Sequence, residues 1–333
     1  MKLNWETKLE KKQRLVDNWR KRNLTIIGRV LIIKTLLISQ IVHLIMFCSV
    51  PKYVVSKLEK IIYQFLWNSK VDKVKRNVIT KGYEDGGIRM INIQNLIFSF
   101  RLRWLSRIVD DTVGCWKEFA LFYLETLGDM KLVLNCTIDK YIVDRFFIDK
   151  VPTFYFEIIQ AWAQLRELLK KDDIYSNSQI LWFNKYVLYD KEPLFYKDWY
   201  NSSIIFLRDL CIEGKFLSLT KLNEKLESSK AKAKALFDYS KLRSAIPRVW
   251  LSNLKDSVFD VPKLHFMKKE KDLRFCSTKL FYEIILKDGG INPGPKYWMN
   301  LMDGHIKLEK HIFEKFENYK RKQTKAIQLE NAL

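Results

Sequence analysis

The sequence predicts a mainly α-helical protein: a helical bundle containing one short β-hairpin, followed by a second helical region. Glycine contributes only 11 and proline only 7 of the 333 residues, and so few chain breakers favour helices over a many-turned β-sandwich. Hydrophobic residues make up 48%, which excludes a disordered chain because there is enough apolar surface to offset the entropy of folding. Apolar residues also recur at three- and four-residue steps, as on one face of a helix.

Three helices are expected before residue 68. Residues 5–22 carry a few apolar anchors among lysines and arginines. The second helix runs from about Thr25, a candidate N-cap, to Cys48, and Pro51 ends it. The third covers residues 54–67. The expected apolar face of the second helix consists of Ile26, Ile27, Val30, Ile33, Leu37, Ile41 and Leu44.

A basic stretch at 68–77 leads to a predicted hairpin over residues 78–93. Its turn is the tetrapeptide from Glu84 to Gly87, because Asp-Gly and Gly-Gly readily adopt the positive φ angles of a tight turn. Another helix is expected over 94–109. We therefore predict one helical subdomain over 1–110.

The second predicted region, 111–333, contains more prolines and carries no motif that constrains residues 110–180. Its apolar patterns predict helices near 115–128, 153–171, 202–212, 218–244 and 276–287, and an amphipathic helix over 305–325.

The charge indicates a polyanionic partner. Lysine and arginine number 59 against 38 aspartates and glutamates, a formal net charge of +21. Such a surface repels itself unless an anion is near, and the common anions are nucleic acid and anionic lipid. A basic protein without a polyanion partner stays open as the alternative.

The cysteines and histidines predict neither a metal nor a cofactor. The five cysteines include no Cys-x-x-Cys pair, and the four histidines have no zinc-finger spacing. Free thiols in a reducing compartment are the expected state. No secretory signal begins the chain, so we expect an intracellular protein of the nucleus, the cytoplasm or both.

One uncharged segment must be considered as a possible membrane-spanning helix. Residues 35–50 carry no formal charge, but these 16 residues are fewer than the about 20 needed to span a bilayer. They also include Gln40 and His43. A buried core helix is the favoured interpretation, with His43 in the core or at an interface and not acting as a catalytic base.

Several ordered motifs resemble one family. In order along the chain, they are Trp19, the pattern formed by Leu24, Thr25, Gly28, Arg29 and Lys34, the apolar helix ending at Pro51, Phe65-Leu66-Trp67, the basic run 73–76 and Gly86-Gly87-Ile88-Arg89-Met90. Together they resemble the segment after the polymerase palm in reverse transcriptases of LINE-type non-LTR retrotransposons. The resemblance covers about residues 14–108 and continues more loosely at 181–187, 199–210 and 240–250.

The resemblance implies a thumb-like bundle that grips a template–primer duplex of RNA and DNA. The family's polymerase uses paired carboxylates to hold two Mg²⁺ ions, and those lie upstream of the matched segment. We therefore expect an upstream-truncated fragment of an RNA-directed DNA polymerase that is catalytically inert alone. Asp110-Asp111 and Asp172-Asp173 are interpreted as surface turns. No phosphate-binding loop, His-Glu-x-x-His or Gly-x-Ser-x-Gly motif is present either.

Basic residues near the matched motifs are the candidate contacts to nucleic acid. Lysine and arginine neutralise backbone phosphates, and these contacts do not distinguish one base sequence from another. Binding to nucleic acid should therefore be salt-sensitive and weakly specific. Because Gly28 has no side chain, either a phosphate or a neighbouring helix could approach the backbone closely there. Arg103 and Arg107 share a helical face, whereas Trp104 is expected to point to the core. The full set is Arg20, Arg22, Gly28, Arg29, Lys34, Lys73, Lys75, Arg76, Arg101, Arg103 and Arg107.

Two other functions remain open from the sequence. The chain is alternatively a degenerate or domesticated helical module that binds protein and no nucleic acid, or a membrane-associated protein that uses residues 24–50. No small-molecule substrate is predicted, and the oligomeric state is left undetermined.

Overall fold

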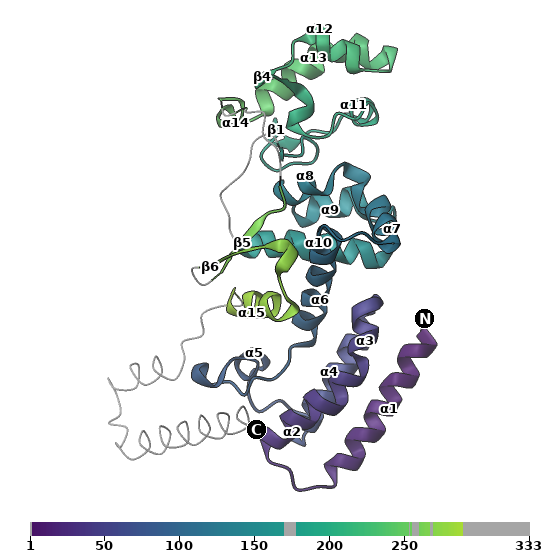
Figure 1. The fold of residues 1–333 in the computed structure, drawn as a ribbon, viewed down its shortest axis with the longest axis vertical. Coiled ribbons are helices and arrows are strands. Elements are labelled where there is room, and N and C mark those ends of the chain that lie inside the picture. Colours follow the sequence, from purple (N-terminus) through teal and green to yellow (C-terminus); the bar gives the residue numbers. More distant parts are fainter. Residues whose placement is uncertain (1, 170–177, 253, 255–259, 267–268, 289–333) are drawn as a thin grey trace, which may run out of the picture.

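The computed structural model describes residues 2–169, 178–252, 254, 260–266 and 269–288, and their fold is mainly α-helical, as predicted. The elements are stacked along one long axis, with α1 to α5 at one end and α11 to α14 at the other (Figure 1). Helix α6 joins the lower and middle parts.

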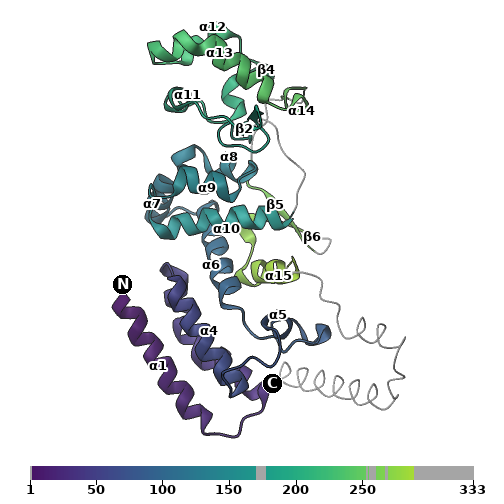
Figure 2. The same ribbon diagram turned by 180° about the vertical axis from the view of Figure 1, so that it is seen from behind.

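The N-terminal helices match the prediction closely. Helix α1 spans Lys2–Arg20 and lies along α4, Lys52–Trp67, as both views show (Figures 1 and 2). In the sequence, these two helices are separated by one long helix made of α2 (Ile26–Ile32), η1 (Ile33–Ile38) and α3 (Ser39–Phe47). Thr25 caps it, since its hydroxyl oxygen accepts a hydrogen bond from the Gly28 N–H at 3.1 Å.

The long helix differs from the prediction because η1 is a π-helical turn. A π-turn adds a residue to the helical repeat and rotates everything that follows. Val30, Ile33, Leu37 and Ile41 are buried as predicted, but Ile38 and Ile45 join them. Three members of the predicted face fall outside the core, with Ile26 and Ile27 exposed and Leu44 only half-buried. His43 is exposed, so it does not lie in the core, and its place at an interface stays a prediction.

The predicted hairpin over 78–93 is wrong, although its turn is real. The segment forms helix α5 (Arg76–Ile79) and a 3-10 turn, η2 (Tyr83–Asp85), and Gly86 has φ +77°. The chain then folds back on the end of α5, where the Ile88 and Met90 N–H groups both donate to the Ile79 carbonyl. Because one carbonyl receives both bonds, no ladder of strand pairs forms.

Helix α6 (Ile93–Ile108) contributes to two apolar cores. One core gathers residues from Trp5 to Phe100, and the other gathers residues from Leu102 to Ile284. The two cores therefore divide within the helix, while the subdomain boundary at residue 110 stays a prediction.

The second region begins with helices that surround the upper end of α6. They are α7 (Cys115–Leu124), the 3-10 turn η3 (Glu125–Leu127), α8 (Met130–Asn135), α9 (Lys140–Phe147) and α10 (Thr153–Leu169). The predicted helices near 115–128 and 153–171 correspond to α7 with η3 and to α10.

The remaining part alternates short helices with two-stranded antiparallel sheets. Residues 202–212 are not the predicted helix, because they contain the 3-10 turn η5 and a short strand, and 218–244 is divided at Ser228, which caps a new helix. The predicted helix 305–325 lies outside the described residues. In order, the elements are β1 (Leu188–Tyr189), β2 (Glu192–Pro193), α11 (Lys197–Asn201), η5 (Leu207–Leu210), β3 (Cys211–Ile212), β4 (Lys215–Phe216), α12 (Leu219–Lys225), α13 (Ser229–Ala245), α14 (Arg248–Ser252), β5 (Lys263–Phe266), β6 (Lys269–Asp272), η6 (Leu273–Phe275) and α15 (Thr278–Asp288).

One helix among the described residues is long and apolar enough to cross a membrane, Ile26–Phe47, with a mean hydropathy of 2.2 over its most apolar window. Buried residues make up 33% of that window. Length and composition alone fit either a core helix or a spanning one.

Candidate nucleic-acid interface

The predicted basic residues form two groups. The first, which we call the N-terminal cations, comprises Arg20, Arg22, Arg29, Lys34, Lys73, Lys75 and Arg76. They come from the end of α1, the start of the long helix and the linker after α4, and these segments all lie in the lower part of the molecule (Figure 1). The second group, Arg101, Arg103 and Arg107, lies on α6.

Two N-terminal cations tie segments together. The Arg29 Nη1 donates to the Leu66 carbonyl at 3.2 Å, which joins the long helix to the end of α4. Arg76 forms ion pairs with Asp72 at 2.8 Å and with Glu59 at 3.0 Å. These arginines hold the fold in place, so they are poorer phosphate ligands than their charge suggests.

Other N-terminal cations are more available. Arg20 makes a loose surface pair with Asp17 at 3.4 Å, and the Arg22 Cζ lies 4.3 Å from the ring centroid of Trp19. Lys73 and Lys75 are exposed in the linker. Exposed pairs of this kind contribute at most about 1 kcal/mol, so exchanging them for a phosphate costs little.

Lys34 has a basic neighbour that sequence reasoning missed. Burial lowers the pKa of Lys34, and the positive charge of Arg89 lowers it further. Arg89 stands in the left-handed region, with φ +52°, after the Gly86-Gly87 turn, and its Cζ lies 4.9 Å from the Tyr83 ring centroid. Its place in the Gly-Gly motif was the signal available in the sequence. Because each of these positive charges disfavours the other, an anion near both would be stabilising.

Gly28 packs against its own N-cap. A Cβ at this position would lie 3.4 Å from the Thr25 hydroxyl oxygen and 3.8 Å from a methyl carbon of Leu24. Both are ordinary contacts with the preceding turn, so no neighbouring helix requires a glycine here.

Arg101 is not a surface contact, and this prediction needs correction. Its side chain is only 2% exposed, and Nε forms an ion pair with Glu157 at 2.7 Å. Its Nη1 and Nη2 atoms donate to the Ile45 carbonyl at 2.9 Å and to the Cys48 carbonyl at 2.7 Å. Arg101 therefore caps the C-terminus of α3 and joins it to α10.

Arg103 and Arg107 share a helical face, as predicted, but differ in role. The Arg103 Nη1 donates to the Cys276 carbonyl at 2.8 Å and anchors α6 to η6. Arg107 makes neither a hydrogen bond nor an ion pair among the described residues, and its Cζ lies 5.7 Å from the Trp104 ring centroid. Trp104 is half-buried and packs against the larger core, which agrees with its predicted orientation.

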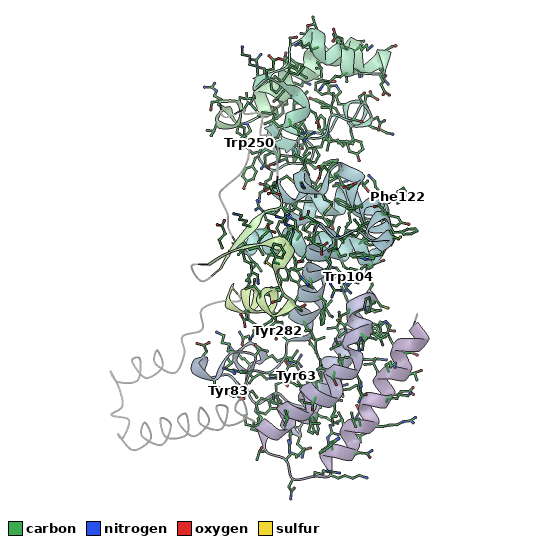
Figure 3. The ribbon with its side chains drawn as sticks, in the orientation of Figure 1. Tyr63, Tyr83, Trp104, Phe122, Trp250 and Tyr282 are labelled. Carbon is green, nitrogen blue, oxygen red and sulfur yellow. The ribbon has the colours of Figure 1, made fainter. Side chains whose placement is uncertain are left out.

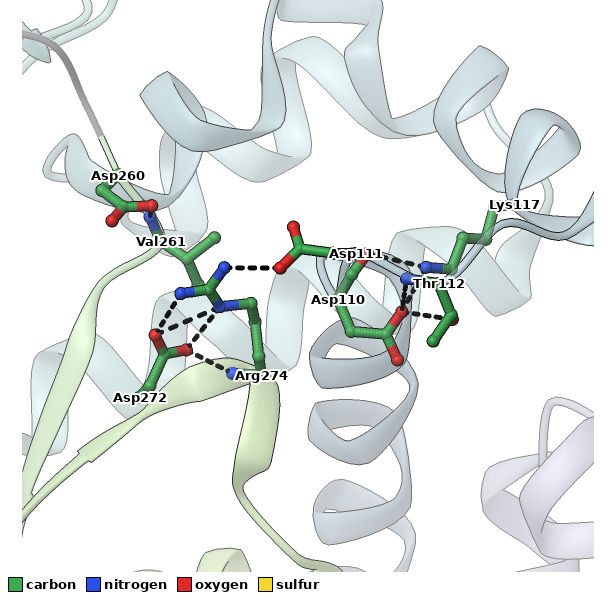
Figure 4. A network of polar contacts seen from close by, with 8 residues as sticks. All are labelled: Asp110, Asp111, Thr112, Lys117, Asp260, Val261, Asp272 and Arg274. Carbon is green, nitrogen blue, oxygen red and sulfur yellow. Dashed lines mark hydrogen bonds and ion pairs between the residues drawn. The ribbon is translucent and has the colours of Figure 1, made fainter.

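Asp110 and Asp111 hold the loop after α6 in place (Figure 4). Asp110 accepts hydrogen bonds from the Thr112 N–H at 3.0 Å and from the buried ammonium of Lys117. Asp111 pairs with Arg274 at 2.8 Å, and Arg274 pairs with Asp272 at 2.7 Å. Within the described ranges no cluster of three metal-ligating side chains occurs. Asp172-Asp173 lies outside them.

The cysteines offer no obvious nucleophile in the core. All five are free, and burial raises the pKa of Cys136 to about 12 and that of Cys276 to about 11. Both thiols are therefore protonated and unreactive at neutral pH.

The protein should become less stable in acid because aspartates anchor the loop after α6 through hydrogen bonds and ion pairs. Hydrogen bonds from Arg274 lower the pKa of Asp272, and those from Lys117 and Thr112 lower the pKa of Asp110 in spite of its desolvation. An unfolded aspartate titrates near about 3.9, so this stabilisation is present above that pH and is lost as the pH falls through the lowered values.

Urea titrations at several pH values will measure this effect. Asp272→Asn should flatten the acid limb of the stability profile, whereas Asp190→Asn, at an exposed carboxylate outside the network, should not. Identical acid limbs for the wild type and Asp272→Asn would contradict the assignment.

Comparisons with known proteins leave the family undetermined. No protein-family model matches the chain, and no curated protein matches it.

Proposed function

We propose that this chain is the thumb and downstream region of a LINE-type reverse transcriptase, and that those N-terminal cations that do not tie segments of the fold together, with Arg89, hold a template–primer duplex of RNA and DNA. The observation that carries the proposal is the convergence of basic side chains from separate segments. The end of α1, the long helix, the linker after α4 and the Gly-Gly turn all bring cations to one end of the molecule.

The chemistry of these residues suits a phosphate backbone. Lys73 and Lys75 are exposed on the linker, and Lys34 and Arg89 lie close enough to repel each other. A phosphate between two such cations removes that repulsion, and phosphate contacts position a duplex without reading its sequence. The order of the motifs from Trp19 to Met90 supports the choice of a polymerase thumb over other basic folds.

Salt dependence of binding will test the proposal. If five cations (Arg22, Lys34, Lys73, Lys75 and Arg89) each neutralise a phosphate, log K for a blunt RNA–DNA hybrid should fall with log salt at a slope of about −4 to −5. The combined variant Lys34→Ala, Lys73→Ala and Lys75→Ala should reduce that slope by about 2 to 3. Filter binding between about 50 and 200 mM salt measures both.

A matched control removes the same charge elsewhere. Lys221, Lys232 and Lys234 are exposed on α12 and α13, at the far end of the molecule (Figure 1). Replacing all three by alanine should leave the slope near that of the wild type. Equal losses in the two triple variants would show non-specific attraction and contradict the proposed interface, and primer extension by the purified chain would contradict its inertness.

One observation supports the alternative of a membrane-associated protein. The 22-residue apolar helix leaves Ile27 and Leu31 exposed. Flotation with vesicles of neutral phosphatidylcholine separates the two functions, because a duplex-binding thumb stays in the aqueous fraction. Co-flotation of the folded wild-type chain would favour the membrane function.

A further inference from the structure

An open hollow of about 370 Å³ lies where α6 ends and α7 begins. Ligand pockets occupy about 300–1,000 Å³, so this one is limited to a small ligand about the size of a single nucleotide. Two tryptophans and two arginines contribute to its lining, which consists of Arg103, Trp104, Arg107, Asp110, Thr112 and Trp116.

Trp104, on α6 (Figure 3), is one of the aromatic side chains that line this hollow. Its indole N–H donates to the Met46 carbonyl at 2.7 Å. Edge contacts from Phe47 and Phe154, with both ring centroids at 5.7 Å, and from Trp116 at 5.3 Å surround it. A ring held in this way loses little freedom when a ligand binds, which favours affinity.

Trp116 is the accessible aromatic surface, with 42% of the residue exposed. Its position depends on Gly114, because a Cβ at residue 114 would lie 3.0 Å from the indole nitrogen and 3.2 Å from Cδ1. The ion pairs of Asp110 with Lys117 and of Asp111 with Arg274 hold the loop on either side (Figure 4). The ring is therefore presented by the first turn of α7, which the neighbouring ion pairs support.

Arg107 supplies an available positive charge beside these rings. Its guanidinium has neither an ion-pair nor a hydrogen-bond partner in the described part of the chain, and it lies 5.7 Å from the Trp104 ring centroid. Arg103 adds a second positive charge, fixed by its bond to the Cys276 carbonyl. The facing carboxylate, Asp110, is already neutralised by Lys117.

We propose that this hollow binds one unpaired nucleotide, with its base stacked on Trp116 and its phosphate paired with Arg107. Every base has a planar face that stacks on an aromatic side chain, and arginine binds phosphate through its planar fork of donors. This inference rests on the proposed function and adds to it a site for the single strand beside the duplex.

Fluorescence anisotropy with labelled single-stranded oligo(U) and with a blunt RNA–DNA hybrid will test the site. Trp116→Ala should weaken oligo(U) binding about tenfold, within the range of one lost base–aromatic stack, and leave hybrid binding unchanged. Trp116→Phe should restore most of the affinity, and Gly114→Ala should weaken binding by displacing the indole. The control is Phe122→Ala, on an aromatic of α7 that is 78% exposed and lies outside the hollow (Figure 3).

Photocrosslinking gives a second readout that needs no variant. Oligo(U) containing 4-thiouridine, irradiated with the wild-type chain, should crosslink within residues 103–117, as mapped by mass spectrometry of the peptides. Crosslinks only elsewhere, or equal effects of Trp116→Ala and Phe122→Ala, would overturn the site.

The two probes separate this inference from the function on which it rests. Wild-type binding to the hybrid without binding to oligo(U) refutes the nucleotide site and leaves the proposed function standing. Binding to oligo(U) through Trp116 without hybrid binding supports the site and refutes duplex gripping. Failure to bind either probe refutes both.

Discussion

Replacement of Arg101 by methionine should lower the free energy of unfolding by about 3–5 kcal/mol, the cost of breaking a buried charge pair by removing one partner. The methionine fills much of the same space but leaves the Glu157 carboxylate without its cation. It also leaves the carbonyls of Ile45 and Cys48 without their donor at the end of α3. Urea unfolding followed by circular dichroism will measure the change.

Two comparisons make the Arg101 result specific. Arg22→Met removes an exposed guanidinium that lies over the Trp19 ring and should cost less than about 1 kcal/mol. Glu157→Gln removes the charge but keeps an acceptor for Arg101, so its cost should lie between the other two. A loss below 1 kcal/mol for Arg101→Met would mean that the carbonyls find other partners.

Alanine at Gly87 should destabilise the protein by about 3 kcal/mol, the upper end of the range for overpacking. Its Cβ would lie 2.2 Å from the Lys81 carbonyl oxygen and 2.7 Å from the Val78 carbonyl oxygen. The Lys81 carbonyl already accepts a hydrogen bond from the Arg89 N–H of the returning chain, and the Val78 carbonyl accepts one from the Lys81 N–H. The backbone must move, so hybrid binding should also weaken as Arg89 moves away from Lys34.

Alanine at Gly28 should stabilise the protein, which is the opposite of its expected effect at Gly87. Residue 28 lies in the first turn of α2, and a Cβ there meets only ordinary contacts at 3.4 Å or more. Alanine should therefore stabilise the protein by about 0.5–1 kcal/mol, because glycine in a helix loses more chain entropy on folding. Thermal unfolding of both variants checks the pair. Weaker hybrid binding by a stabilised Gly28→Ala protein would instead indicate a phosphate lying against residue 28.

The helical periodicity was sufficient to predict the N-terminal helices and α6. It failed where the backbone departs from a uniform helix or strand. The π-turn at 33–38 depends on local packing, and a 3.6-residue pattern contains no sign of it. The Gly86-Gly87 pair correctly predicted a turn, but short apolar runs on either side fit a folded-back loop as well as two strands.

The candidate site was predicted in composition and only partly in geometry. Arg101, Arg103 and Arg107 look alike in the sequence, yet one is buried, one is anchored by a carbonyl and one has no polar partner among the described residues. Those differences depend on α3, α10 and η6, which are distant along the chain. The proximity of Arg89 to Lys34 depends on the Gly-Gly turn and was missed for the same reason.

Helix α6 begins in one apolar core and ends in the other, and both its ends are anchored. Its 16 residues rise by about 24 Å at 1.5 Å each. Under the two proposals above, this fixed length would set how many nucleotides separate the last bound base pair from the base stacked on Trp116. A one-residue insertion in α6 would turn one end of the helix by about 100° relative to the other.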